Sequence, residues 1–187
     1  MPPPLLLERY EEAHQPPLPN ASAYENYRAA GWPAAPYSFL KSSEGLRLQA
    51  YDDATGKPLA AWEMPKWVAT IGYGATSING KPIQPGQIIT AAEADKLFNE
   101  QIPKYQNWKN LTQSGSLTPS QHEALTSFEY NLWPGIWKKN AMPILDAVNK
   151  WDFNWAWKLM QQYAYAQGKY VPGLANRRAK EAQLLLA

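Results

Sequence analysis

The sequence predicts an α+β fold in which a small antiparallel β-region lies beside a mainly helical lobe. Two observations support this class. Between residues 54 and 83, short alternating segments are separated by turn residues, as in β-hairpins. From Thr90 onward, apolar residues recur at helical spacing and capping motifs precede the longer segments. No internal repeat is visible, so we expect one folded domain over residues 38–187.

The first predicted elements run from Ser38 to Ile83. We expect a helix over Ser38–Tyr51, with Glu44 beside a stripe of apolar and small residues: Phe39, Ser42, Ser43, Leu46 and Ala50. Residues 55–58 (Thr-Gly-Lys-Pro) predict a turn, and Trp67–Tyr73 alternates as a strand. Asn79-Gly80 is a strong signal for a two-residue hairpin turn between residues 75–78 and 81–83.

Helices account for the rest of the chain. Thr90 and Glu93 form a capping-box pattern that opens a helix to about Ile102. Thr118-Pro119-Ser120-Gln121 forms a second, with proline at the first helical position, and we expect that helix to reach Leu132. Three further helices are predicted: Pro143–Lys150, Asp152–Ala166 and Leu174–Leu186. Trp151 and Trp155, four residues apart, are expected to pack in the core.

Residues 1–37 differ in composition and form a predicted N-terminal extension. They contain eight of the seventeen prolines and have a net charge of −2, whereas the remainder has +4. Proline at this density disfavours a packed helix. We expect the extension to pack against the helical lobe, away from Glu44, through its large aromatic residues: Tyr10, Tyr24, Tyr27, Trp32 and Tyr37. A docking or delivery role is the alternative.

Composition excludes several classes of function. The chain of 187 residues has no cysteine, which rules out disulfides, Cys-ligated zinc and a thiol nucleophile. Its two histidines, His14 and His122, are too few and too far apart for a typical zinc hydrolase site. No apolar run is long enough to span a membrane, and the N-terminus lacks the features of a signal peptide. We expect no metal, no cofactor and no nucleic-acid partner.

The most informative motif begins with Glu44-Gly45 and continues to Asp53, nine residues later. A Thr70-Ile71-Gly72-Tyr73-Gly74 strand follows. Two carboxylates on different elements, with a gap between them, meet the requirement of glycoside hydrolysis. One donates a proton to the leaving oxygen, and the other stays ionised to act on water or the sugar.

This pattern resembles the phage-type lysozymes of glycoside hydrolase family 24, and the similarity covers roughly residues 38–187. By resemblance, Glu44 is the catalytic glutamate, Asp53 the catalytic aspartate and Thr70 the threonine that helps to hold the water. The nine-residue offset favours Asp53 over its neighbour Asp52. Residues matching the central helix and the C-terminal motif are Gln121, Ala124, Leu125, Ser127, Phe128, Asn131, Leu132 and the segment 173–181.

Two departures from the family pattern stand out. Sixteen residues, Ala54–Ala69, separate Asp53 from Thr70, where most relatives have about five. The family's Asn-x-Gly after the central helix is Asn131-Leu132-Trp133-Pro134-Gly135 here. We therefore expect an altered cleft floor.

Four residues are predicted to bind substrate: Tyr73, Trp62, Trp67 and Asn131. Trp62 and Trp67 are chosen because they lie in the long insertion beside the predicted site. In the Asn176-Arg177-Arg178 cluster, at least one arginine is expected to be structural, pairing with Glu181 or with an acid in the catalytic lobe.

The resemblance implies a lysozyme-like two-lobe fold and an endo-acting muramidase. Such an enzyme cleaves the β-1,4 bond between N-acetylmuramic acid and N-acetylglucosamine in peptidoglycan. We expect a monomeric phage or prophage endolysin, made in the host cytoplasm and released through a holin to act in the periplasm. Two alternatives remain open: a secreted antibacterial effector with an immunity partner, and a wall-binding module without catalysis.

Overall fold

The computed structural model describes residues 37–112, 117–138 and 140–187. Of the predicted N-terminal extension only Tyr37 belongs to the described residues, so the rest of that prediction lies outside them. The helices are α2 (Ser38–Glu44), α3 (Ala91–Gln101), α4 (Pro119–Leu132), α5 (Met142–Asn149), α6 (Phe153–Gln161) and α7 (Pro172–Leu185). The strands are β1 (Arg47–Asp52), β2 (Ala69–Gly72), β3 (Ser77–Ile78), β4 (Lys81–Pro82), β5 (Tyr165–Ala166) and β6 (Lys169–Tyr170).

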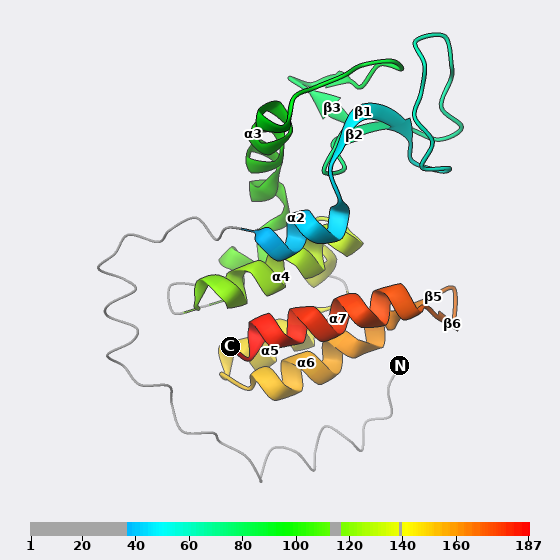
Figure 1. Cartoon of the computed structure of the whole chain (residues 1–187). Coiled ribbons are helices and arrows are strands. Elements are labelled where there is room, and N and C mark those ends of the chain that lie inside the picture. The colour runs from blue at the N-terminus through cyan, green and yellow to red at the C-terminus, as the bar shows by residue number, and fades with distance from the viewer. Residues whose placement is uncertain (1–36, 113–116, 139) are drawn as a thin grey trace.

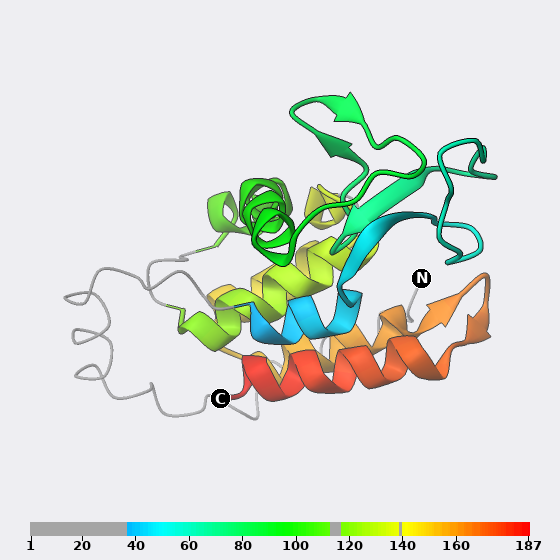
Figure 2. The ribbon, with the colours of Figure 1, turned by 45° about the horizontal axis from the view of Figure 1, so that its top comes forward.

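The elements form two lobes, which confirms the predicted α+β class. Strands β1–β4 and helix α3 make the upper lobe in Figure 1, here called the β-lobe. Helices α4–α7 make the lower, helical lobe, and α2 lies between the two (Figure 2). No helix among the described residues is both long enough and apolar enough to cross a bilayer.

Each lobe has its own hydrophobic core. The core of the helical lobe contains fully buried aromatic side chains, among them Trp108, Phe128 and Trp137. The core of the β-lobe is built from smaller residues such as Leu59 and Ile71. A third cluster joins the lobes beside α2, and its members are Tyr37, Leu40, Phe98 and Ile102.

The predicted helix over Ser38–Tyr51 is wrong in its second half. The helix ends at Glu44, because Gly45 adopts φ 71° and its amide bonds back to the carbonyl of Lys41. Residues from Arg47 onward form β1, which pairs antiparallel with β2. On the other edge of β1, the carbonyl of Leu48 accepts from Ile89. A strand can be paired on both edges, and a helix over the same residues would forgo this pairing.

Several local predictions are confirmed. Asn79 and Gly80 have φ values of 52° and 75° and connect β3 to β4, as a type I′ turn requires. Both predicted capping boxes are present, at the starts of α3 and α4. Helix α3 packs closely on β2, since a methyl group added at Gly72 would lie 3.5 Å from Ala94.

The predicted helix over Asp152–Ala166 is too long. Helix α6 ends at Gln161, and the chain then forms the β5–β6 hairpin through Gln167 (φ 51°) and Gly168 (φ 75°). The Gln-Gly pair was the overlooked turn signal. Trp151, with φ 62°, lies before the helix rather than on it. It nevertheless packs against the core of the helical lobe, as Trp155 does.

Helix α2 has only seven residues, and other parts of the protein hold it in place. Its N-cap residue, Tyr37, provides no side-chain cap. Instead, the buried carboxylate of Glu123 on α4 accepts a hydrogen bond from the amide of Leu40 at 3.1 Å. This places a negative charge at the positive end of the helix dipole. Glu123 therefore supplies the cap that the local sequence of α2 lacks.

We predict that Glu123→Ala destabilises the protein by about 1–3 kcal/mol, because it leaves a buried backbone donor without its acceptor. Glu123→Gln should cost less, since its amide oxygen still accepts. Chemical denaturation measures both. The exposed Glu100→Ala is the control, and a loss equal to it would show that Glu123 does not cap α2.

Candidate active site

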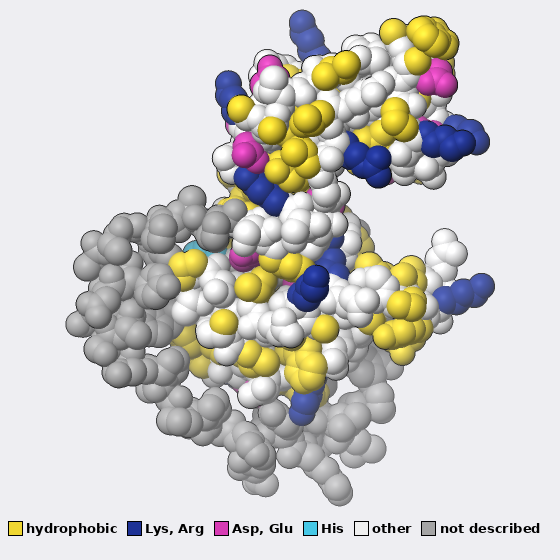
Figure 3. Space-filling view, viewed as in Figure 1, with side chains coloured by type: hydrophobic (Ala, Val, Ile, Leu, Met, Phe, Trp, Pro, Cys, Tyr) yellow, Lys and Arg dark blue, Asp and Glu magenta, His cyan; other side chains and the backbone are white. Residues whose placement is uncertain are grey.

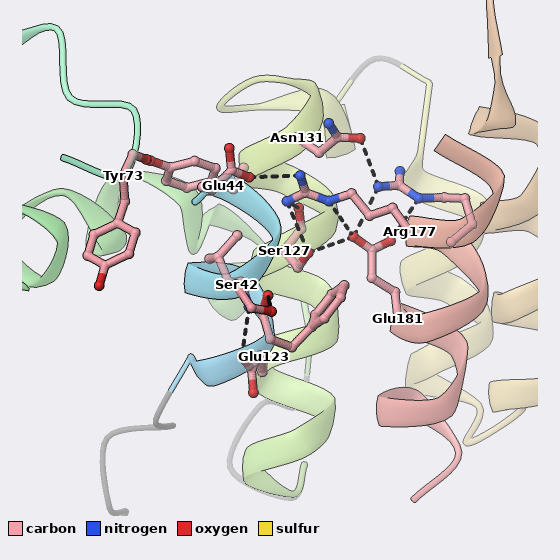
Figure 4. A network of polar contacts seen from close by, with 12 residues as sticks. Ser42, Glu44, Tyr73, Glu123, Ser127, Asn131, Arg177 and Glu181 are labelled. Carbon is pink, nitrogen blue, oxygen red and sulfur yellow. Dashed lines mark hydrogen bonds and ion pairs between the residues drawn. The ribbon is translucent and has the colours of Figure 1, made fainter. Parts of the chain in front are cut away.

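Glu44 occupies the last turn of α2, where the two lobes meet (Figure 4). Its Oε1 lies 2.7 Å from Nη1 of Arg177 on α7. The two side chains are 21% and 11% exposed, so solvent only partly screens this ion pair. Since α2 and α7 are far apart in sequence, the contact fixes the carboxylate relative to the helical lobe.

The guanidinium of Arg177 is itself held by several acceptors. Its Nη2 donates to the backbone oxygen and to the hydroxyl of Ser127, both at 3.2 Å. Its Nε donates to Glu181 at 3.3 Å. Because acceptors surround the group on three sides, Arg177 has little freedom to turn away from Glu44.

Glu181 is fully buried at the centre of this network. It accepts from the hydroxyl of Ser127 at 2.6 Å and from Nη2 of Arg178 at 3.0 Å, and its Oε2 lies 2.8 Å from Nε of Arg178. Burial raises the pKa of Glu181, while Arg178, Ser127 and Arg177 act in the opposite direction. The sequence predicts that an arginine of this cluster pairs with Glu181 or with an acid in the catalytic lobe. Arg177 makes both contacts, with Glu181 and with Glu44.

Arg178 connects the network to the end of α4. Its guanidinium lies over the ring of Phe128, 4.7 Å from the centroid, and Nη2 donates to Oδ1 of Asn131 at 2.9 Å. Burial lowers the pKa of Arg178, and Glu181 opposes that shift. Asn131, a predicted substrate ligand, thus has its side-chain oxygen occupied by Arg178. Its contact with substrate stays a prediction.

Three tyrosines around Glu44 were missed from the sequence: Tyr51, Tyr105 and Tyr130. Burial raises the pKa of each phenol, and the negative charge of Glu44 raises it further. The rings of Tyr105 and Tyr130 lie 4.4 Å apart. The family motif at residues 44–74 contains only Tyr51 of the three, so the other two carried no signal beyond ordinary core tyrosines.

Tyr73 contributes its backbone more than its ring to this region. Its carbonyl accepts from the hydroxyl of Tyr130 at 2.7 Å. Its ring packs on Phe98 at 5.3 Å and points away from Glu44 in Figure 4. The observed contacts assign it a packing role, and substrate binding by Tyr73 stays a prediction.

The two neighbouring aspartates have different surroundings. Asp52 is 4% exposed, and its carboxylate accepts from the amide of Ala54 and the hydroxyl of Thr55, each at 3.1 Å. Asp53 is exposed, and its charge raises the pKa of Tyr51, as the charge of Glu44 also does. Tyr51 therefore lies within electrostatic reach of both Glu44 and Asp53. The choice of Asp53 as the reacting aspartate stays a prediction.

Thr70 lies in β2 directly opposite Tyr51 of β1. It is 2% exposed, and its hydroxyl has no hydrogen-bond partner among the described residues. Buried hydroxyls are normally paired with protein or with an ordered water. An unpaired hydroxyl next to Tyr51 is suited to hold a water molecule.

The two tryptophans predicted to bind substrate, Trp62 and Trp67, are 85% and 78% exposed. They belong to the insertion that follows Asp53, and the amide of Asp53 bonds to the carbonyl of Val68 at 3.1 Å. Trp67 directly precedes Val68, whose carbonyl accepts this hydrogen bond from Asp53. Among the described residues, no group of three or more His, Cys, Asp or Glu is placed to hold a metal ion.

Residues 41–181 match the Phage lysozyme family, a span that covers most of the chain. This chain belongs to the phage lysozyme family. Within the matched span lie Glu44, Asp53, Thr70 and Arg177.

Several known proteins are similar to most of this chain. An endolysin of Bacillus phage PZA is 30% identical over 79% of this chain and 52% of its own length. A SAR-endolysin of bacteriophage PS119 is 30% identical over 76% of each. The structure of an endolysin from Escherichia coli O157:H7 phage FAHEc1 superposes with a TM-score of 0.67 at 28% identity, covering 82% of this chain and 92% of that one. The chain spans about half the length of the Bacillus phage endolysins it matches.

We predict that Glu181→Gln lowers the free energy of unfolding by about 3–5 kcal/mol. The substitution removes the buried negative charge that pairs with both Arg177 and Arg178. Thermal and chemical denaturation measure the loss, and Lys180→Gln on the exposed face is the control. A loss below about 1 kcal/mol would instead mean that Glu181 is already protonated in the folded protein.

Proposed function

We propose that this protein is an endo-acting muramidase that hydrolyses the β-1,4 bond between N-acetylmuramic acid and N-acetylglucosamine in peptidoglycan. The observation that carries this proposal is the placement of Glu44 at the junction of the lobes. There it pairs with Arg177. The negative charges of Glu44 and Asp53 both raise the pKa of Tyr51. Family membership and the endolysins among its relatives support the same reaction.

In the proposed mechanism, Glu44 donates its proton to the glycosidic oxygen as the bond to the sugar breaks. Proton transfer leaves a carboxylate 2.7 Å from the guanidinium of Arg177, which stabilises that product charge. Arg177 also fixes the direction of the carboxyl group, since Ser127 and Glu181 hold it.

Asp53 and Thr70 act from the β-lobe in this proposal. Asp53 is exposed and stays ionised to activate a water or to support the oxocarbenium-like transition state. The unpaired hydroxyl of Thr70 positions that water. Two carboxyl groups with opposite tasks then act on one bond, Glu44 from the end of α2 and Asp53 from the β-lobe.

We further propose that the protein is a monomeric phage or prophage endolysin. It would be made in the host cytoplasm and reach the periplasm through a holin. The endolysins and SAR-endolysins among its relatives support this role over that of a secreted effector. The intact Glu44, Asp53 and Thr70 argue against a wall-binding module that has lost catalysis.

Glu44→Gln should abolish lytic activity, because it removes the transferable proton while keeping the shape of the side chain. Melting should stay close to that of the parent, since the amide oxygen still accepts from Arg177. Turbidity loss of chloroform-treated Gram-negative cells measures the lysis. Retention of more than a few per cent of activity would place the general acid elsewhere.

Asp53→Asn and Asp52→Asn form a matched pair that tests the choice of aspartate. We expect Asp53→Asn to lower lysis by at least about 100-fold, as expected for loss of a general base. Asp52→Asn should be mild, because its carboxylate serves the backbone of the neighbouring turn. The opposite order would identify Asp52 as the reacting group.

A further inference from the structure

The insertion between Asp53 and β2 is an ordered part of the β-lobe. Residues 54–68, here called the arm, first run back along the edge of β1 that faces away from β2. The amide of Asp52 donates to the carbonyl of Lys57 at 2.9 Å, and the amide of Leu59 donates to Ala50 at 2.8 Å. Leu59 is 5% exposed and belongs to the β-lobe core. The first half of the arm is thus anchored by backbone pairing and by a buried side chain.

The middle of the arm is also held. Gly86 donates to the carbonyl of Leu59 at 2.9 Å, and its backbone approaches Ala61 so closely that an added methyl group would lie 2.9 Å from it. The carboxylate of Glu63 accepts from the amide of Ala60 at 2.6 Å, which closes a turn. Beyond this turn the arm returns to the opposite edge of β1, where Val68 accepts from the amide of Asp53.

Asp52 connects the two ends of the arm. Its buried carboxylate accepts from Ala54 and Thr55 at the start of the arm. Burial raises the pKa of Asp52, but hydrogen bonds from these residues and from the amides of Lys66 and Trp67 at the far end outweigh it and lower the pKa. The carboxylate of Asp52 thus bonds the start of the arm and lies close to the backbone of its far end, next to Asp53.

This held arm presents three large apolar side chains to solvent. Trp62, Met64 and Trp67 are 85%, 86% and 78% exposed. Folded proteins normally gain stability by burying side chains of this kind. A group of such residues on an anchored segment is typical of a binding surface. Lys57 and Lys66 of the arm are exposed as well, and Figure 3 shows hydrophobic and basic side chains mixed over the β-lobe.

The helical lobe has an aromatic surface on the same side of the molecule. Tyr165 and Tyr170 of the β5–β6 hairpin are 56% and 58% exposed, and their rings lie 5.6 Å apart. Figures 1 and 2 both place this hairpin and the arm on the same side, one on each lobe.

We propose that the arm is an additional glycan-binding surface, which Asp52 holds beside Asp53 and which binds a peptidoglycan strand beyond the bond that is cleaved. This inference rests on the proposed muramidase function. Tryptophan rings offer flat apolar faces to the C–H faces of sugars. The exposed lysines complement the carboxylates of muramic acid and of the wall peptide. The position of Trp67, one residue from the partner of Asp53, makes the arm continuous with the catalytic groups.

Binding measured without turnover tests the arm. Full-length Glu44→Gln protein is sedimented with purified peptidoglycan sacculi, with and without Trp62→Ala and Trp67→Ala. We expect the double tryptophan variant to bind at least about tenfold more weakly. Ile88→Ala, which removes a 72% exposed apolar side chain of the β-lobe outside the arm, should bind as the parent does. Equal binding by the double variant would overturn the proposal.

Asp52 is tested as a positioning residue in the same assay. Asp52→Ala should weaken sacculus binding to the level of the tryptophan variant and speed hydrogen exchange of the amides of Lys66 and Trp67. Asp52→Asn, which keeps an acceptor oxygen, should restore part of the binding. Faster exchange with unchanged binding would reduce Asp52 to a structural role and refute its part in the proposal.

Two further outcomes separate the arm from its alternatives. If the tryptophan variant loses binding to vesicles of phosphatidylethanolamine and phosphatidylglycerol but keeps sacculus binding, the arm binds membranes and the proposal is wrong. If the protein binds sacculi through the arm but releases no reducing ends from them, the muramidase proposal fails and the arm stands. If lysis depends on Glu44 while the tryptophans affect neither binding nor KM for sacculi, the proposal for the arm is wrong and the muramidase proposal is unaffected.

Discussion

The ion pair between Glu44 and Arg177 is the contact on which the arrangement of this site depends. It joins a short helix between the lobes to the last helix of the chain. Burying charges costs free energy unless each is paired, and here Arg177 and Arg178 are balanced by Glu44 and Glu181. The near-neutral cluster tolerates its burial, and Glu44, whose side chain is 21% exposed, lies at the edge of the cluster.

The short helix α2 shows how tertiary contacts replace local stability. Seven residues form a marginal helix on their own, because helix nucleation is costly. Here Glu123 on α4 caps the first turn, and Arg177 on α7 holds the last. Leu40, fully buried, fills the space between the lobes. The carboxyl of Glu44 is therefore directed by residues that lie 79 to 133 positions away in the chain.

In the β-lobe, the adjacent residues Asp52 and Asp53 have different roles in the structure. Asp52 is the last residue of β1 and Asp53 is the first residue of the turn that follows, and the two have different surroundings. Asp52 turns to the backbone of the insertion and holds it, whereas Asp53 stays exposed near Tyr51. A longer loop is thus inserted directly after Asp53, and a neighbouring carboxylate holds the start of that loop.

Local sequence predicts the fold class, the two capping boxes, the Asn79-Gly80 turn and the motif that carries Glu44, Asp53 and Thr70. These depend on nearest neighbours and on fixed spacings, which a linear chain displays directly. Only the tertiary structure decided that the chain from Arg47 forms a strand, because that outcome depends on pairing with β2 and with residues 87–89. Tertiary packing also places Tyr105, Tyr130 and Arg177 around Glu44, and it buries Asp52 while leaving Asp53 exposed. Burial and charge pairing of this kind arise only when distant segments pack together.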